Sequence, residues 1–179
     1  MLAQIGVPHT VSPADVDESA RPGEAPERYV ERLAREKALL VRERERGVAL
    51  AADTTVALGA EIYGKPADRE DCARMLLALS GRTHRVLTAV ALAHGNGFDS
   101  ALSVSEVTFA ELSRADCDRY WATGEPADKA GAYAVQGLGA LFIRHIAGSY
   151  TGIMGLPLYE TGVLLARAGL GHALRPVAP

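Results

Sequence analysis

The sequence has 179 residues, of which 48% are hydrophobic and 23% are charged, and its formal net charge is −3. These values are typical of a soluble globular protein with one sizeable core, and they exclude a general electrostatic attraction to nucleic acid or to an acidic membrane. The sequence shows neither an apolar run long enough for a membrane span nor a signal-peptide pattern, so we expect a cytoplasmic protein whose anionic ligands are held by local cations.

The first predicted elements are a loop, a helix and a buried strand. Residues 12–27 are acidic and proline-rich, which is typical of a loop. A helix is expected over residues 26–46, and Lys37 falls on its apolar stripe. The apolar run over residues 48–58 predicts a buried strand with a polar break near its middle.

A second helix and a hairpin follow. Asp68 is the expected N-cap of a helix that stops at Gly81. Two strand-like segments, residues 83–95 and 99–112, flank the dipeptide Asn96-Gly97, which is a strong signal for a hairpin turn.

The last third of the chain alternates helix, strand and helix. Ser113 is the expected cap of a short helix, residues 140–148 predict a strand, and a final helix is expected over residues 157–169. Cys72 and Cys117 lie on apolar helical faces without metal-like spacing, so we expect reduced core residues. Interleaved helices and strands with a long antiparallel hairpin favour an α/β or α+β domain with a mixed sheet.

Polar residues interrupt the first strand at Asp53, Thr54 and Thr55. A carboxylate inside an apolar strand is costly unless it is paired or bound to a metal. One interpretation is a buried, hydrogen-bonded aspartate that ties down a loop. The other is a Mg²⁺ ligand or a general base.

Two further polar clusters flank the second helix. In GKPAD, Lys65 precedes a proline and therefore lies in an extended or turn segment. In SGRTH, Arg82 supplies a guanidinium suited to phosphate or carboxylate recognition. The alternatives are a solvated loop lysine and a polar turn after the helix.

The fourth cluster is the glycine-rich stretch DKAGAYAVQGLGALF, residues 128–142, which contains Lys129 and Gln136. Its glycines can let backbone N–H groups approach a ligand, and a glutamine suits the edge of a nucleobase. The alternative is a turn into a strand with an incidental glutamine.

Other common site types are missing from the sequence: it contains no P-loop, no Rossmann fingerprint, no zinc spacing and no clear Ser or Cys nucleophile pattern. The remaining acidic residues and lysines are the groups used in metal-assisted phosphoryl chemistry. A polyphosphate substrate is therefore the hypothesis that the residues favour.

Seven segments, in order, resemble the Maf family of nucleoside triphosphate pyrophosphatases: PERYVERLAREKA, AADTTV, GKPAD, LSGRTHRVLTAVAL, EVTFAEL, DKAGAYAVQGLGALF and GSYTGIMGLPLYET. The resemblance implies a single Maf-like domain over residues 1–179, with a mixed sheet, flanking helices, two lobes and a central cleft, similar to inosine triphosphate pyrophosphatases. It implies hydrolysis of a nucleoside triphosphate to the monophosphate and pyrophosphate. It also implies a divalent cation, Mg²⁺ or Mn²⁺, a cytoplasmic homodimer, and roles in removing unwanted nucleotides and in arrest of cell division.

The resemblance also assigns roles to residues. Asp53 matches the catalytic carboxylate, as a general base or a metal-linked acid, and Glu18 matches an acidic position that helps to bind metal. Lys37 matches a helix lysine that would point into the cleft. Lys65 matches a lysine on the phosphate side, and Lys37 and Lys65 are expected to be catalytic together with Asp53.

The base-binding positions resemble those of the subgroup that prefers dTTP and UTP. Thr54, Arg82 and Gln136 would form the selectivity set, in which Gln136 lies near the base. Lys129 is a further candidate for substrate binding at the margin of the cleft.

One feature departs from the family pattern. Members begin with a strand and an S-x-S-P-R-R loop, whereas this sequence begins at MLAQIG, inside the helix that follows that loop. Either the start is misassigned or the chain is a shortened homologue with weak or no activity. The second case leads to an alternative hypothesis, a catalytically impaired nucleotide-binding or interaction protein.

Overall fold

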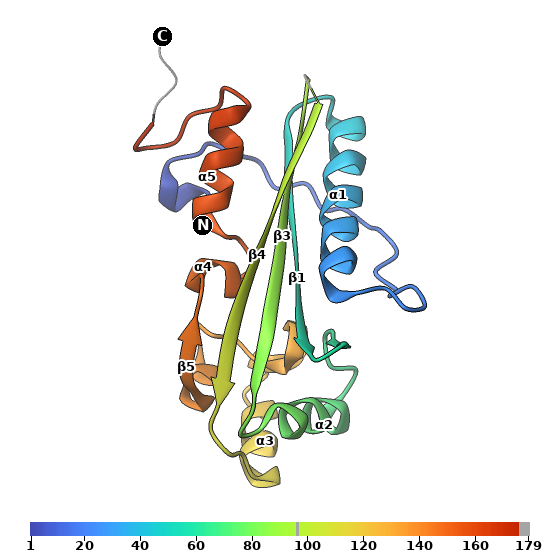
Figure 1. Ribbon diagram of the computed structural model, residues 1–179, viewed down its shortest axis with the longest axis vertical. Coiled ribbons are helices and arrows are strands. Elements are labelled where there is room, and N and C mark those ends of the chain that lie inside the picture. Colours follow the sequence, from blue (N-terminus) through green and yellow to red (C-terminus); the bar gives the residue numbers. More distant parts are fainter. Residues whose placement is uncertain (96, 176–179) are drawn as a thin grey trace. The chain divides into compact units, whose positions relative to one another are not determined.

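A computed structural model describes residues 1–95 and 97–175. Its five strands form one sheet in the order β2-β1-β3-β4-β5 (Figure 1). The strands are β1 (Ala49–Leu58), β2 (Glu61–Tyr63), β3 (Thr83–His94), β4 (Gly97–Phe109) and β5 (Ile143–Ala147). The α-helices are α1 (Pro26–Glu45), α2 (Arg69–Leu79), α3 (Arg114–Trp121), α4 (Tyr150–Ile153) and α5 (Leu158–Arg167). Short 3₁₀ helices are η1 (Ala3–Ile5), η2 (Glu125–Asp128), η3 (Ala130–Ala132) and η4 (Leu138–Phe142).

The outer strands of the sheet pair antiparallel with their neighbours. Val56 of β1 lies opposite Tyr63 of β2, and Val107 of β4 lies opposite Ile146 of β5. The β4–β5 register shifts between Thr108 and Phe109. The predicted α/β class, with helices flanking a sheet, is confirmed.

The chain divides into two compact units. Unit 1 consists of residues 1–53, 88–103 and 155–179, and unit 2 consists of residues 54–87 and 104–154. Strands β1, β3 and β4 supply residues to both units.

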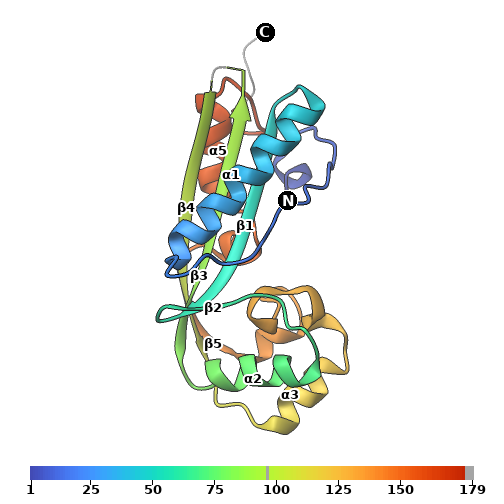
Figure 2. The ribbon, with the colours of Figure 1, turned by 90° about the vertical axis from the view of Figure 1, so that its right-hand side faces the viewer.

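In unit 1 the strands lie between α1 and α5 (Figures 1 and 2). Pro26 occupies the first turn of α1, where its missing N–H costs nothing, and the helix ends at Arg46, which adopts a left-handed conformation. Val90 and Leu92 of β3 pack with Leu164 and Leu165 of α5 in a buried cluster. Burial of such side chains is the main force that holds the helix on the strands.

Unit 2 has its own apolar core, which includes Cys72 and Cys117. Both cysteines are buried and free, as predicted. The side chain of Asp68 accepts the backbone N–H of Asp71 and caps α2, and Ser113 caps α3 in a reciprocal capping box with Asp116. Both predicted helix starts are therefore confirmed.

The strand predicted over residues 140–148 is partly wrong. Only Ile143–Ala147 form β5, and the preceding residues 138–142 form η4. A 3₁₀ turn replaces the first part of the strand because residues 137–139 fold around a carboxylate, as described below. The predicted turn at Asn96-Gly97 includes Asn96, which lies outside the described residues, although β3 and β4 flank it as expected.

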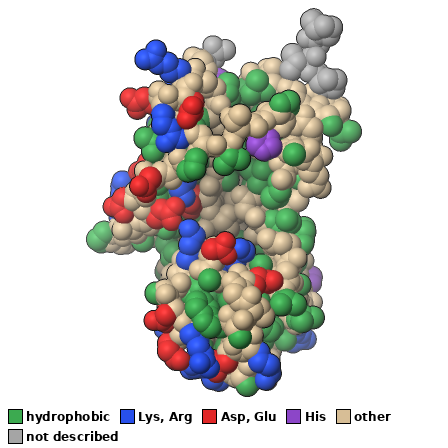
Figure 3. Space-filling model, turned by 180° about the vertical axis from the view of Figure 1, so that it is seen from behind, with side chains coloured by type: hydrophobic (Ala, Val, Ile, Leu, Met, Phe, Trp, Pro, Cys, Tyr) green, Lys and Arg blue, Asp and Glu red, His purple; other side chains and the backbone are tan. Residues whose placement is uncertain are grey.

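Within residues 1–95 and 97–175, no helix has the length and apolarity needed to cross a membrane. On the face shown in Figure 3, basic and acidic side chains are interspersed. This arrangement agrees with the small net charge of the sequence and with the expectation that any anion is held locally.

Candidate active site

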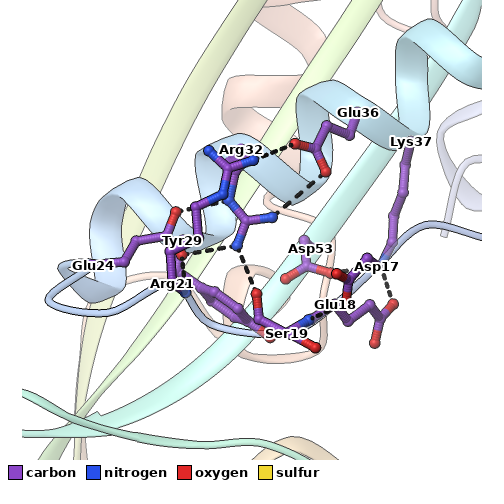
Figure 4. Close-up of polar contacts among 10 residues, drawn as sticks. All are labelled: Asp17, Glu18, Ser19, Arg21, Glu24, Tyr29, Arg32, Glu36, Lys37 and Asp53. Carbon is purple, nitrogen blue, oxygen red and sulfur yellow. Dashed lines mark hydrogen bonds and ion pairs between the residues drawn. The ribbon is translucent and has the colours of Figure 1, made fainter.

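Three residues predicted to carry chemistry meet in unit 1 (Figure 4). The Nζ atom of Lys37 on α1 donates to Glu18 Oε1 at 2.6 Å and to Asp53 Oδ1 at 2.7 Å. The side chains of Lys37 and Asp53 are 16% and 10% exposed, and that of Glu18 is 46% exposed. A helix, a strand and a loop thus contribute one charged group each to the same cluster.

Helical spacing explains why Lys37 is partly buried. It lies four residues after Leu33 and three after Ala34, both of which are buried, so all three side chains share one side of α1. The aliphatic part of a lysine can cover apolar surface while its ammonium reaches a polar group. Here the ammonium reaches two carboxylates.

The two carboxylates keep Lys37 charged. Burial by itself would lower the pKa of Lys37, but the hydrogen bonds to Asp53 and Glu18 outweigh it and the pKa is raised. Lys37 is therefore an ammonium ion at neutral pH and does not serve as a proton acceptor there. An ionised carboxylate such as that of Asp53 is an acceptor and can take that role.

A second layer of contacts fixes the loop that carries Glu18 (Figure 4). The hydroxyl of Tyr29 donates to the backbone oxygen of Glu18 at 2.9 Å, and Arg32 donates to the backbone oxygen of Ser19 at 3.1 Å. Arg32 also binds both carboxylate oxygens of Glu24, at 2.7 and 2.8 Å. These bonds tie residues 18, 19 and 24 of the loop to α1.

A pocket of about 570 Å³ adjoins this second layer. Four arginines line it, together with two glutamates and three uncharged residues: Arg21, Arg28, Arg32, Arg35, Glu24, Glu36, Pro22, Gly23 and Leu39. Because Glu24 and Glu36 neutralise part of the positive charge and neither Lys37 nor Asp53 lines the pocket, it does not add to the case for the predicted catalytic residues.

The carboxylates of Glu18 and Asp53 fit a role in holding a divalent cation. Both converge on a single cationic atom, the Nζ of Lys37, from different elements. Among the described residues, no group of three or more His, Cys, Asp or Glu side chains could hold a metal ion. Mg²⁺ needs only one or two protein carboxylates when water and substrate phosphates complete its coordination, so a pair of carboxylates is compatible with such a site.

In unit 2, Lys65, predicted to be catalytic, and Lys129, predicted to bind substrate, both lie near one acidic residue. Lys129 forms an ion pair with Asp128. The pKa of Asp128 is lowered, first by its hydrogen bond to Lys129 and further by the charges of Lys129 and Lys65. The N–H of Gly131 donates to the backbone oxygen of Gly64 at 3.0 Å, which joins the loops that carry the two lysines.

Arg82 and Thr54 occupy other parts of unit 2. Arg82 is exposed in the turn between α2 and β3. Two residues later, His84 is buried, and its Nε2 lies 2.9 Å from the hydroxyl of Tyr133. Burial lowers the pKa of His84 to about 4, so the ring is neutral at pH 7. Thr54 follows Asp53 directly in β1 and is half-buried.

Gln136 is exposed in a loop whose glycines contact protein groups. A Cβ at Gly137 would lie 2.2 Å from Glu125 Oε2, and one at Gly139 would lie 2.7 Å from the hydroxyl of Tyr120. The expectation that these glycines open the backbone to a ligand is therefore wrong for both positions. They make room for Glu125 and Tyr120.

The structure thus places Glu18, Lys37 and Asp53 together in unit 1. It places the other predicted residues in unit 2: Thr54, Lys65, Arg82, Lys129 and Gln136. The sequence interpretation missed Tyr29, Arg32 and Glu125. Their spacing gives no signal, because they act mostly on backbone atoms of loops. The available hint was the family resemblance. Tyr29 and Arg32 lie inside one of the segments that resemble the Maf family, and Glu125 lies three residues before another.

Comparison with known proteins gives consistent matches over nearly the whole chain. The family model described as Maf-like protein matches residues 1–168. A dTTP/UTP pyrophosphatase of Pseudoalteromonas atlantica is 49% identical, with 96% of this chain and 92% of that protein covered. Proteins of the same name from Hahella chejuensis and Myxococcus xanthus are 51% and 53% identical, each with 95% of this chain and 87% of the relative covered.

Proposed function

This chain belongs to the Maf family, and from that membership we propose that it is a pyrophosphatase that hydrolyses dTTP and UTP to the monophosphate and pyrophosphate. The relatives named above, at about half identity over most of the chain, support the substrate class. The observation that carries the chemistry is the contact of Asp53 and Glu18 with one ammonium group, that of Lys37. A largely buried carboxylate that a cation holds in place can accept a proton from an attacking water.

In the proposed reaction, Asp53 takes a proton from the water that attacks the α-phosphorus. Lys37 holds the Asp53 carboxylate in place through the 2.7 Å hydrogen bond and keeps a positive charge beside the reacting groups. Pyrophosphate leaves with the electrons of the broken α–β bond. The rate depends on position and electrostatics, since phosphoryl transfer needs little covalent help from the protein.

Glu18 and Asp53 would hold the divalent cation, Mg²⁺ or Mn²⁺. When bound, it supplies positive charge against the triphosphate and lowers the pKa of bound water. Tyr29 and Arg32 keep the backbone of the Glu18 loop on α1 and so hold the carboxylate near Asp53. In metal sites, contacts of this kind fix the orientation of the residues that bind the metal directly.

We further propose roles in substrate binding for residues of unit 2. Lys65 and Lys129 would contact phosphate oxygens, and Arg82, Thr54 and Gln136 would select the base. A glutamine amide carries both a donor and an acceptor, which matches the O4 and N3–H edge of thymine and uracil. A polar pocket of this kind rejects other bases because its own groups would remain unpaired.

The experiment is a release assay for pyrophosphate with dTTP, UTP, CTP and GTP in the presence of Mg²⁺ or Mn²⁺. The proposal expects faster release from dTTP and UTP than from the other two. Nucleotide binding without turnover would favour the alternative of a catalytically impaired binding protein. A cytoplasmic homodimer is part of the proposal, and light scattering of the purified protein tests its dimeric state.

A further inference from the structure

The carboxylate of Glu125 gathers three hydrogen-bond donors within unit 2. Glu125 begins η2 and accepts from the hydroxyl of Tyr120 at 2.6 Å, from the N–H of Leu138 at 2.9 Å and from the N–H of Gly139 at 3.0 Å. Two of the three donors are backbone groups of the loop that contains Gln136. A side chain far from this loop in sequence therefore holds its C-terminal half.

The other half of the same loop is held by Tyr120. Its hydroxyl accepts the N–H of Ala134 at 3.1 Å while it donates to Glu125. The bonds at Ala134, Leu138 and Gly139 lie on both sides of Gln136. The pair Tyr120–Glu125 therefore fixes the backbone before and after this one residue.

The loop is shaped to this pair. A Cβ at Gly137 would lie 2.2 Å from Glu125 Oε2, far inside the distance that two heavy atoms tolerate. Glu125 thus lies against the backbone of Gly137. Because Gly137 directly follows Gln136, this contact fixes the backbone next to the glutamine. Val135 on the other side is buried, while Gln136 itself is exposed. The loop is anchored at its flanks and presents the glutamine outward.

We propose that Glu125 is a positioning residue for Gln136 and that the Tyr120–Glu125 pair sets how strongly the enzyme discriminates between pyrimidine bases. The inference rests on the proposed function, in which Gln136 contacts the base edge. The donor and acceptor of an amide can match O4 and N3–H of uracil only at one orientation, and cytosine reverses both groups. A loop that shifts by about 1 Å loses this match, since small displacements of a positioning group cost rate steeply.

Glu125 carries a negative charge at neutral pH. Burial alone would raise its pKa, but hydrogen bonds from Tyr120, Gly139 and Leu138 outweigh burial and lower the pKa below its ordinary value. The residue is therefore an anion at neutral pH and acts only as an acceptor. A glutamine of the same shape would turn an N–H₂ donor toward these N–H groups.

The test compares Glu125→Gln and Tyr120→Phe with the matched control Glu106→Gln. Glu106 is an exposed residue of β4 in the same unit, so the control removes the same charge away from the loop. For each protein, kcat and KM are measured with dTTP, UTP, CTP and GTP, and folding is checked by circular dichroism and thermal unfolding. Gln136→Ala and the double variant Glu125→Gln/Gln136→Ala complete a cycle.

The proposal expects Glu125→Gln to lower the ratio of kcat/KM for dTTP over CTP by about tenfold, as for a lost hydrogen bond to a charged group. Most of the change should come from a higher KM for dTTP. Tyr120→Phe should change the ratio in the same direction by a smaller factor, and Glu106→Gln should not change it. In the Gln136→Ala background, Glu125→Gln should alter the ratio by less than about twofold, because both act through one contact.

Four outcomes separate the possibilities. An unchanged dTTP/CTP ratio in folded Glu125→Gln and Tyr120→Phe, with an active wild type, overturns the positioning role. An equal loss for all four nucleotides also overturns it, since a purely structural effect predicts that pattern. If Glu125→Gln does not fold, Tyr120→Phe decides by the same criterion. A wild type that releases no pyrophosphate from any nucleotide contradicts the proposed function itself.

Discussion

The Nζ atom of Lys37 lies 2.7 Å from Oδ1 of Asp53, which joins the middle of α1 to the first half of β1 through one ion pair. The same Nζ atom lies 2.6 Å from Oε1 of Glu18. One cation therefore serves two carboxylates from separate segments. Substitutions in this cluster should affect activity and stability in separable ways.

Substitution of the proposed base tests catalysis. Asp53→Asn keeps the shape of the side chain but removes the proton acceptor, so we expect kcat with dTTP to fall by about 10²- to 10⁴-fold. The folded state should persist, because the amide oxygen can still accept from Lys37. The measurement is steady-state pyrophosphate release, with circular dichroism as the check of folding. The control is Asp15→Asn, an exposed position of the loop that carries Glu18, and this variant should retain wild-type turnover.

Removal of the shared cation tests its contribution to stability. Lys37→Met should lower the free energy of unfolding by about 2 kcal/mol, because two carboxylates lose a charged hydrogen-bond donor. Lys129→Met, which breaks an ion pair with the exposed Asp128, should cost less than about 1 kcal/mol. Urea titrations at pH 7 measure both. Equal stability of Lys37→Met and wild type would show that the cluster stabilises nothing.

The pH dependence of the Lys37 contribution has a definite sign. The pKa of Lys37 is raised above its ordinary value of 10.5, so the folded state holds the proton more tightly than the unfolded chain. The stabilisation is fully present below 10.5 and is lost as pH rises through the raised pKa. As pH rises from 7, the difference in stability between wild type and Lys37→Met should therefore shrink only in strongly alkaline solution.

The Arg32–Glu24 pair predicts a sensitivity to acid. Hydrogen bonds from the Arg32 guanidinium lower the pKa of Glu24 from 4.5 to about 2. The stabilisation from Glu24 is present above pH 4.5 and is lost as pH falls towards 2. Arg32→Gln should flatten the fall of melting temperature over this range, whereas Arg28→Gln, an exposed arginine one turn earlier, should keep the wild-type slope. Identical slopes in all three proteins would rule out the pair as the cause.

Buried His84 makes a separate prediction for NMR. Burial lowers its pKa to about 4 from the ordinary value of 6.5, so the folded protein should show an imidazole that titrates near pH 4. In denaturant the same residue should titrate near 6.5. Because the unfolded chain then binds a proton that the folded chain does not, stability should fall as pH drops from 6.5 towards 4. A folded-state midpoint at 6.5 would contradict the burial of this ring.

Local signals in the sequence predicted much of the fold. The starts of α1, α2 and α3 were predicted because the residues that mark them, Pro26, Asp68 and Ser113, act within their own helices. Strand β2 was missed because three residues are too few to show a period. Residues 140–142 were misassigned to a strand because they belong to a 3₁₀ turn whose cause, Glu125, lies 13 residues before Leu138.

The candidate site was likewise predicted in part from the sequence. A carboxylate at position 53 inside an apolar run and a lysine on an apolar helix stripe were visible in the sequence, and they do meet. The supporting contacts of Tyr29 and Arg32 were not visible, because each binds a backbone oxygen of a loop without regular structure. Such contacts depend on how the loop lies on the helix, and spacing along the chain does not encode it.

The most direct test of the proposed activity identifies the products of dTTP hydrolysis by ³¹P NMR in the presence of Mg²⁺. We expect dTMP and pyrophosphate to appear together in equal amounts, at a rate that falls steeply in Asp53→Asn. Formation of dTDP with inorganic phosphate, or an unchanged rate in Asp53→Asn, would contradict it.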